Sequence, residues 1–346
     1  MRNKNRFVSL SALCALMLCV GGVTALAGDP FDKDPKHQLP KPDTKAPDQK
    51  KPVKVFILLG QSNMCGMGEI EPETTKGTLA YLTKKEGRYP HLLGADGKWT
   101  VRNDVWNVVT VVKPSQGWLT PGCQGKTIGP ELQFGYIMGQ LHDEMVLILK
   151  AAQGGRSLCY DFLPPGSERF EVTQKDKSGA EKKYIHAGYK DVAPAWEVGT
   201  EPKPIEVKGQ RRPAGWQYDM SVAEIHKVLD NLKTSFPSYN GQGYEIAGFV
   251  WFHGWNDIVG GVYADRYETN LVQFIKSLRA EFKVPKAPFV IAACGFGGWD
   301  TTGKGSGQTL KVINAQLAVS GEKGKYPEFA GNVKTTESRD FWREKD

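Results

Sequence analysis

The chain has 346 residues, of which 24% are charged and 40% hydrophobic, and its formal net charge is +7. At about one domain per 100 to 200 residues, this length allows one large domain or two small ones with a sizeable core. The basic residues are spread as short pairs without interleaved aromatics or a nucleic-acid motif, so we expect a solvated basic surface and no nucleic-acid partner.

Residues 1–27 have the layout of a secretory signal peptide. Three basic residues precede an apolar stretch over 7–26, and Ala25 and Ala27 are the small residues of a cleavage site. No later run reaches the roughly 18 apolar residues of a membrane span. We therefore expect cleavage after Ala27 and export to the periplasm or the outside of the cell.

Residues 28–52 carry a proline every few positions and almost no apolar side chains, which predicts a disordered tether before a folded domain over 53–346. Four cysteines remain after signal cleavage: Cys65, Cys123, Cys159 and Cys294. An even number in an exported protein permits disulfides, but the spacing leaves their pairing open.

From residue 53 onward, apolar runs that indicate buried strands alternate with stretches of helical apolar spacing. The predicted order is strand 53–59, helix 129–143, strand 146–151, helix 217–236, strand 245–252, helix 263–282, strand 289–293, helix 308–319 and strand 332–336. This alternation predicts a parallel sheet flanked by helices. Residues 74–125 and 164–213 break the rhythm and are expected to be loop insertions, because neither holds enough apolar residues for its own core.

Glycines and hydrogen-bonding side chains follow the first four predicted strands. The segments are Gly60-Gln61-Ser62-Asn63, Gln153-Gly154-Gly155-Arg156-Ser157, His253-Gly254-Trp255-Asn256-Asp257 and the glycine-rich run 294–300. Ligands bind at the carboxyl ends of parallel strands, and glycines there let backbone N–H groups approach an oxyanion. Ser62 is therefore expected to be more than a turn residue, although it is not in a G-x-S-x-G nucleophile elbow.

Four short motifs together carry a family resemblance. GQSNM at 60–64, IGPE at 128–131, GGRSL at 154–158 and VWFHGWND at 250–257 resemble the sialate O-acetylesterase-like carbohydrate esterases of the SGNH hydrolase superfamily. The resemblance runs from about residue 53 to the C-terminus. It implies a three-layer, flavodoxin-like α/β fold, with a mainly parallel sheet and helices on both faces.

The resemblance also implies an activity. It is that of a serine esterase that removes O-acetyl or other small acyl groups from sugars through an acyl-enzyme intermediate. The expected partner is an acetylated carbohydrate, and no cofactor or metal is expected. The rival hypothesis is a carbohydrate-binding protein on the same scaffold without turnover.

By position, the resemblance makes Ser62 the nucleophile and its own backbone N–H an oxyanion donor. Gly129 would give a second backbone N–H, and each such donor is worth about 2.7 to 4 kcal/mol at the transition state. Many members have W-x-Q-G-E-x-D where this chain has WFHGWND, so the side-chain donor is Asn256 or His253, and we favour Asn256. The substrate-binding residues are expected to be Gln61, Asn63, Gly154, Gly155 and Asp257.

A serine nucleophile needs a neighbouring base, usually histidine. The family resemblance places that histidine close to the C-terminus, but no histidine follows His253 in this sequence. Three hypotheses stay open. The chain is truncated before its base, or His253, the one histidine at a predicted strand end, is the base, or the protein binds carbohydrate without turnover.

Overall fold

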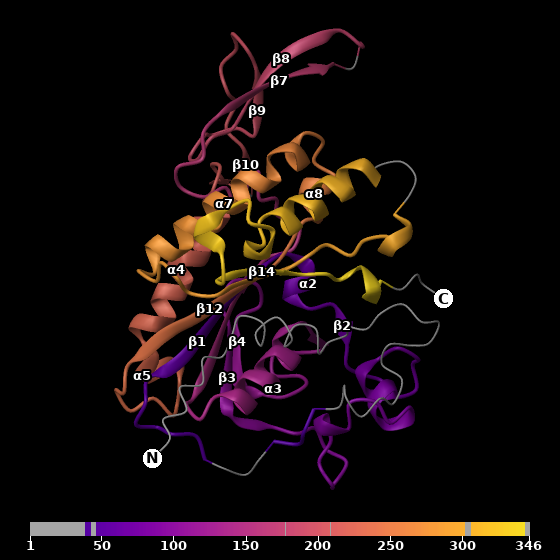
Figure 1. Cartoon of the computed structure of the whole chain (residues 1–346), viewed down its shortest axis with the longest axis vertical. Coiled ribbons are helices and arrows are strands. Elements are labelled where there is room, and N and C mark those ends of the chain that lie inside the picture. The colour runs from indigo at the N-terminus through magenta and orange to yellow at the C-terminus, as the bar shows by residue number, and fades with distance from the viewer. Residues whose placement is uncertain (1–38, 43–45, 177, 208, 302–305, 343–346) are drawn as a thin grey trace.

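A seven-stranded sheet forms the centre of the computed structural model, which describes residues 39–42, 46–176, 178–207, 209–301 and 306–342. The strand order is β14-β13-β12-β1-β6-β3-β4 (Figure 1). All neighbouring strands are parallel except β3 and β4. The strands are β1 (Val53–Gly60), β3 (Arg102–Val109), β4 (Ser115–Leu119), β6 (Val146–Ala152), β12 (Tyr244–Phe252), β13 (Phe289–Ala292) and β14 (Val333–Thr336).

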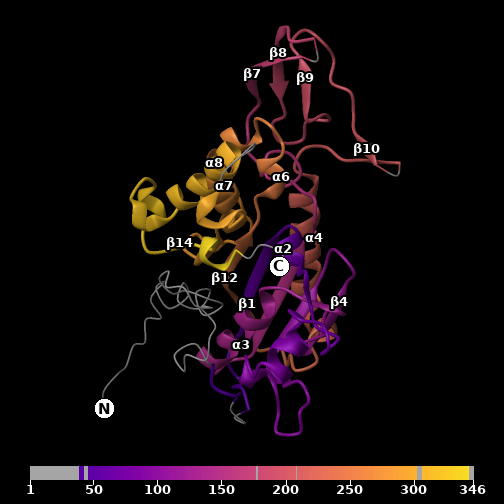
Figure 2. The same ribbon diagram turned by 90° about the vertical axis from the view of Figure 1, so that its right-hand side faces the viewer.

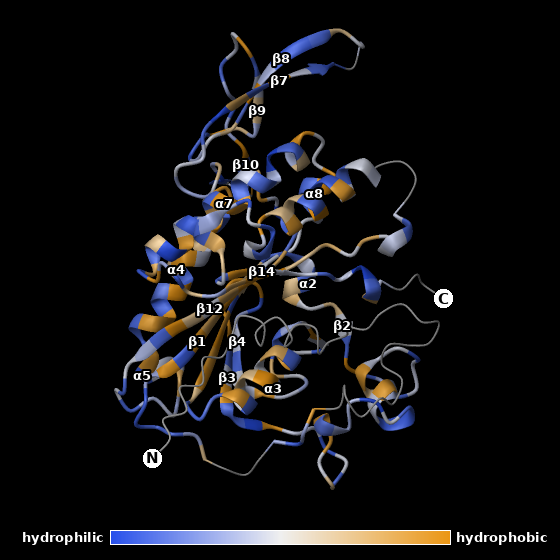
Figure 3. Cartoon of the chain, in the orientation of Figure 1, coloured by the Kyte–Doolittle hydropathy of each residue, from blue (hydrophilic) through white to orange (hydrophobic). Residues whose placement is uncertain are grey.

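Helices cover both faces of this sheet. Side chains alternate between the faces of a strand, and those of β1 divide accordingly between two apolar clusters. One cluster includes α3 (Glu131–Leu141), and the other includes α4 (Trp216–Asp230), α7 (Tyr263–Glu281) and α8 (Ser306–Ala318). The predicted three-layer α/β architecture is therefore confirmed, and Figure 3 shows its central strands as the most hydrophobic part of the ribbon.

Each strand and helix predicted from the sequence is present, with small shifts at the ends. The predicted helix over 217–236 is interrupted at Asn231, which separates α4 from the short α5 (Leu232–Ser235). The short helices α2 (Ser62–Cys65) and α6 (Trp255–Ile258) follow β1 and β12 directly.

The prediction that residues 74–125 are a loop insertion is wrong for two strands of the main sheet. β3 pairs in parallel with β6, and β4 pairs antiparallel with β3. Val105 packs in the cluster that includes α3, whereas Trp106 and Val108 pack in the opposite one. Because the apolar residues of β3 face both clusters, its sequence lacks the alternation that distinguishes a strand from the polar sequence around it.

Residues 164–213 form separate small sheets. β7 (Phe170–Lys175), β8 (Glu181–His186) and β9 (Ala195–Glu197) make one, and β10 (Glu206–Val207) pairs with β11 (Gln210–Arg211). The three-stranded sheet projects away from the main sheet in two perpendicular views (Figures 1 and 2). Another two-stranded pair, β2 (Gly68–Glu69) with β5 (Thr127–Ile128), lies between α2 and α3 in sequence.

The end of the predicted tether contacts the folded domain. Asp48 forms a parallel bridge with Glu144, and its N–H donates to the Asp143 carbonyl at 2.6 Å. The prediction that fixed structure begins only at Val53 is therefore wrong for these last residues, because backbone bonding holds a segment that lacks apolar side chains. The predicted signal peptide and residues 28–38 lie outside the described residues, and no described helix has the length and apolarity to cross a membrane.

Candidate active site

Four of the glycine-containing turns meet at one edge of the sheet. In the parallel pairings, Gly60 at the end of β1 lies opposite Ala152 of β6 and Phe252 of β12. Phe252 in turn lies opposite Ala292 of β13. The segments that follow these strands therefore start side by side, at the carboxyl edge where open α/β sheets bind ligands.

Ser62 is the first residue of α2 and is partly exposed at this edge. A methyl group on Gly154 would lie 3.8 Å from the Ser62 Cβ, so the turn after β6 packs directly against the serine. Gly154 and Gly155 are exposed, and Asn63 is half-buried beside Ser62. The space next to the serine is thus bordered by backbone rather than by bulky side chains.

Gln61 connects the serine turn to the turn after β12. Its buried side-chain amide donates to Asn256 Oδ1 at 2.9 Å and to the Arg156 carbonyl at 3.0 Å, and its oxygen accepts from the Trp255 N–H at 2.6 Å. This bond fixes the Asn256 amide through its oxygen. Its N–H groups have no hydrogen-bond partner among the described residues.

The Gly129 N–H already has a partner. It donates to Glu131 Oε1 at 2.8 Å, while Glu131 Oε2 lies 2.6 Å from Lys150 Nζ. Lys150 and Glu131 are both 1% exposed, and Lys150 also donates to the Cys65 carbonyl at 2.8 Å. The geometry does not support the expectation that Gly129 donates to the oxyanion. It shows instead a buried ion pair that sequence reasoning missed, although a lysine within an apolar strand is a signal for one.

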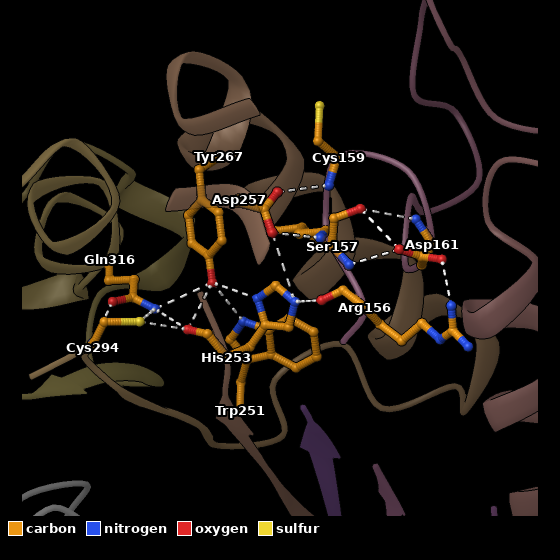
Figure 4. Close-up of polar contacts among 11 residues, drawn as sticks. Arg156, Ser157, Cys159, Asp161, Trp251, His253, Asp257, Tyr267, Cys294 and Gln316 are labelled. Carbon is orange, nitrogen blue, oxygen red and sulfur yellow. Dashed lines mark hydrogen bonds and ion pairs between the residues drawn. The ribbon is translucent and has the colours of Figure 1, made fainter. Parts of the chain in front are cut away.

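His253 lies in the core behind the site (Figure 4). Its Nε2 lies 2.8 Å from the Arg156 carbonyl, which can only accept, so this nitrogen carries the proton. Nδ1 lies 3.1 Å from the Tyr267 hydroxyl, and the ring stacks on Trp251. Burial lowers the pKa of His253 to about 3. With both nitrogens engaged, the predicted role of His253 as the base finds no support here.

Asp257 is fully buried and does not reach the exposed edge. Its carboxylate accepts from the backbone N–H groups of Leu158 at 2.8 Å and Cys159 at 2.9 Å (Figure 4). Burial raises the pKa of Asp257 to about 8. The two backbone hydrogen bonds favour the charged carboxylate and lower the pKa, but their effect is smaller than that of burial. The structure does not support the predicted contact of Asp257 with substrate. Asp257 instead holds the turn after β6 against α6.

The turn after β6 has a second internal support. Asp161 Oδ2 accepts from the Ser157 N–H at 2.8 Å and from its hydroxyl at 3.0 Å. The Arg156 guanidinium lies over the Trp216 ring, 4.8 Å from its centroid. These bonds orient the Arg156 carbonyl toward Gln61 and His253, a role that the GGRSL motif alone did not reveal.

No group of three or more His, Cys, Asp or Glu side chains is placed to hold a metal ion within the part of the chain that the structure describes. The four cysteines of the folded domain are free thiols. Burial raises the pKa of Cys159 and of Cys294 above the ordinary range of a thiol.

Several solved structures resemble the chain, and three of them show the range of similarity. A protein from Arabidopsis thaliana has 16% identity and a TM-score of 0.45, over 83% of this chain and 85% of that one. A carbohydrate acetylesterase from Xanthomonas citri has 12% identity and a TM-score of 0.46, over 85% of this chain and 52% of that one. NanS has 14% identity and a TM-score of 0.42, over 83% of this chain and 78% of that one.

No curated protein matches the chain at a significant level. A family model does match, over residues 52–187 and 209–327, which together make up most of the chain. The gap between these ranges falls within the segment that carries the small projecting sheets. The chain belongs to the family of carbohydrate esterases described as sialic acid-specific acetylesterases.

Proposed function

We propose that this protein is an exported serine esterase that removes O-acetyl or other small acyl groups from carbohydrates, with Ser62 as the nucleophile. The observation that supports this most is the convergence at one sheet edge of a partly exposed serine, the backbone of Gly154 and the oriented amide of Asn256. Membership of the carbohydrate esterase family supports a sugar ester as the substrate.

In the proposed reaction, Ser62 Oγ attacks the acyl carbonyl and its proton passes to a base. The carbonyl electrons move to the oxygen, which the Ser62 N–H and the Asn256 amide stabilise. Collapse of this intermediate breaks the bond to the sugar oxygen, which takes the proton from the base. Water then hydrolyses the acyl-enzyme by the same steps and releases the acid.

No hydrogen bond links Ser62 to any of the described histidines. His91 bonds to Gln133, His186 to Gln174 and His226 to Glu281, while His142 lies 3.8 Å from Glu144. His253 bonds to Arg156 and Tyr267 as described above. The proposed mechanism therefore assigns the base to none of these histidines.

Covalent labelling tests the nucleophile. A fluorophosphonate probe should label Ser62, as mapped by mass spectrometry, and Ser62→Ala should abolish both the label and the hydrolysis of an aryl acetate. Ser178→Ala, which changes an exposed serine of the projecting sheet, is the matched control. The test uses the 346-residue chain. Label on another residue of an active protein would refute the role of Ser62.

The proposed oxyanion donor is tested in the same assay. Asn256→Ala should lower kcat by about 10²- to 10³-fold, as expected for the loss of one preorganised donor. Asn240→Ala, which changes an exposed asparagine bonded to Gln49, should leave kcat unchanged. Equal rates in the two variants would exclude Asn256 as a donor.

A further inference from the structure

Three tryptophans are exposed beside the candidate active site. Trp255, Trp299 and Trp342 are 46%, 58% and 40% exposed. They are not scattered, because the half-buried ring of Phe296 joins two of them. Its centroid lies 5.0 Å from that of Trp255 and 6.0 Å from that of Trp342, both edge to face. Gathered exposed aromatics of this kind mark binding surfaces.

The three tryptophans come from consecutive strands of the sheet. Trp255 follows β12, Trp299 follows β13 in the turn Gly298–Asp300, and Trp342 follows β14. Since β12, β13 and β14 are neighbours and parallel, these rings gather at the same carboxyl edge as Ser62. A methyl group on Gly298 would lie 3.4 Å from Trp342, which brings the last two turns into contact.

This surface is continuous with the candidate active site. Trp255 immediately precedes Asn256, and its N–H donates to the Gln61 side chain at 2.6 Å. Gln61 in turn immediately precedes Ser62. The aromatic rings therefore begin at the residues that orient the proposed oxyanion donor and extend away from them.

Trp299 is held in one orientation although it is the most exposed of the three. Its Nε1 donates to Asp340 at 2.6 Å, and the Arg339 guanidinium lies 3.9 Å from its ring centroid. Arg339 is itself fixed by two bonds to Glu337, at 2.9 and 2.6 Å. One face of the indole is thus covered by a guanidinium while much of the ring stays exposed. A ring ordered before binding loses less entropy when a ligand stacks on it.

We propose that Trp255, Phe296, Trp299 and Trp342 form an aromatic platform on which pyranose rings of a carbohydrate chain stack beside Ser62. A pyranose presents a face of C–H groups that suits an aromatic ring and a rim of hydroxyls that suits carboxylates and guanidinium groups. The platform offers both, since Glu337, Arg339 and Asp340 border Trp299. The proposal rests on the proposed function, because the stacked ring is either the sugar that carries the acyl group or the next sugar in the same chain.

Binding without turnover tests the platform. The Ser62→Ala protein is run in native gels that contain acetylated xylan, acetylated mannan or mucin with O-acetylated sialic acids, and its retardation gives an apparent Kd. Trp299→Ala and Trp342→Ala, each added to Ser62→Ala, should weaken binding about 3- to 10-fold, the range expected for one aromatic contact. Trp299→Phe, which keeps a ring, should recover much of this loss. Tyr244→Ala, which removes a 40% exposed ring at the opposite end of β12, is the control.

The outcomes separate the platform from the esterase. Retardation that depends on the tryptophans, with no labelling of Ser62, would keep the platform and refute the proposed function. Labelling of Ser62 without retardation in any of the three gels would overturn the platform alone. Unchanged affinity in both tryptophan variants, with intact folding by circular dichroism, would also overturn it.

Discussion

The carbonyl oxygen of Arg156 links the two turns that flank the candidate nucleophile. It accepts from the Gln61 amide at 3.0 Å and from His253 Nε2 at 2.8 Å. Both donors are buried, so the loss of either bond would leave a polar group unpaired, at a cost of about 1 to 3 kcal/mol. One backbone oxygen therefore couples the position of the serine turn to a histidine in the core.

The environment of His253 predicts a dependence of stability on pH. Burial lowers its pKa to about 3, whereas an unfolded histidine titrates near pH 6.5. Between these values the unfolded chain binds a proton that the folded chain does not. This contribution to stability is therefore present above about pH 6.5 and is lost as the pH falls toward 3, at up to about 1.4 kcal/mol per pH unit.

His253→Gln should remove this part of the pH dependence and keep turnover per folded molecule. Glutamine can still donate to the Arg156 carbonyl, and it does not titrate. Urea unfolding at pH 7, 5.5 and 4.5 should show the stability of the wild type falling toward that of the variant with acidification. The raised pKa of Asp257 acts with the opposite sign, so the difference between the two proteins is the quantity to compare. A large loss of kcat in a folded variant would restore His253 as the base.

At the scale of elements, Lys150 joins β6 to both helices that border the site. Its three donors go to Cys65 at the end of α2, to Gln124 and to Glu131 at the start of α3. Every proton of the ammonium group is thus bonded at a buried position, and the opposite charge of Glu131 lies 2.6 Å away. A buried ion pair of this kind contributes more to the relative placement of β6, α2 and α3 than to the free energy of unfolding.

Lys150→Met should lower the free energy of unfolding by about 3 to 5 kcal/mol, because it leaves the Glu131 carboxylate buried without a counter-charge. The double variant Lys150→Met/Glu131→Gln should recover much of that loss, since no unpaired charge remains. Urea denaturation of the single and double variants measures both effects. Lys311→Met, which breaks an exposed pair with Asp265, is the control and should cost less than about 1 kcal/mol. A double variant as unstable as the single one would contradict the charge argument.

At the scale of the whole molecule, the seven-stranded sheet brings turns as far apart in sequence as those after Gly60 and after Thr336 to one edge. The three-stranded β7–β9 sheet stands apart from it (Figures 1 and 2). Figure 3 shows that projecting sheet as mainly hydrophilic. The catalytic proposal and the aromatic platform both depend on the main sheet, and the small sheets contribute no residue to either.

The N-terminal region carries a prediction about processing. The signal-peptide layout and the composition of residues 28–47 predict that the exported protein begins at Gly28 and that trypsin cuts it early after Lys45. Lys50 should be spared, because Asp48 is bonded to the domain and Lys51 lies 3.9 Å from Glu144. N-terminal sequencing before and after brief digestion tests both parts. A mature protein that starts at Met1 would exclude export by this signal, and early cleavage after Lys50 would exclude the docked segment.

The sequence alone was enough to predict the strands and helices of the core, because their apolar spacing is a local property. It also placed Ser62 at the carboxyl end of the first strand, since the apolar run stops at Gly60. It did not distinguish β3 and β4 from an insertion. β3 pairs with β6, which lies some forty residues away, and β4 joins the sheet only through β3.

Only the tertiary structure decided which polar residues reach the site. His253, Asn256 and Asp257 lie in one short turn, and the sequence does not show which of the three can contact a ligand. Once α6 packs against α7 and α8, His253 and Asp257 are 2% and 0% exposed, while Asn256 stays partly exposed against Gln61. His253 and Asp257 can be buried because each finds hydrogen-bond partners in the core. Without such partners, burial of a polar side chain would cost free energy. Those partners come from Arg156, Leu158 and Tyr267, and their approach is a property of the folded chain.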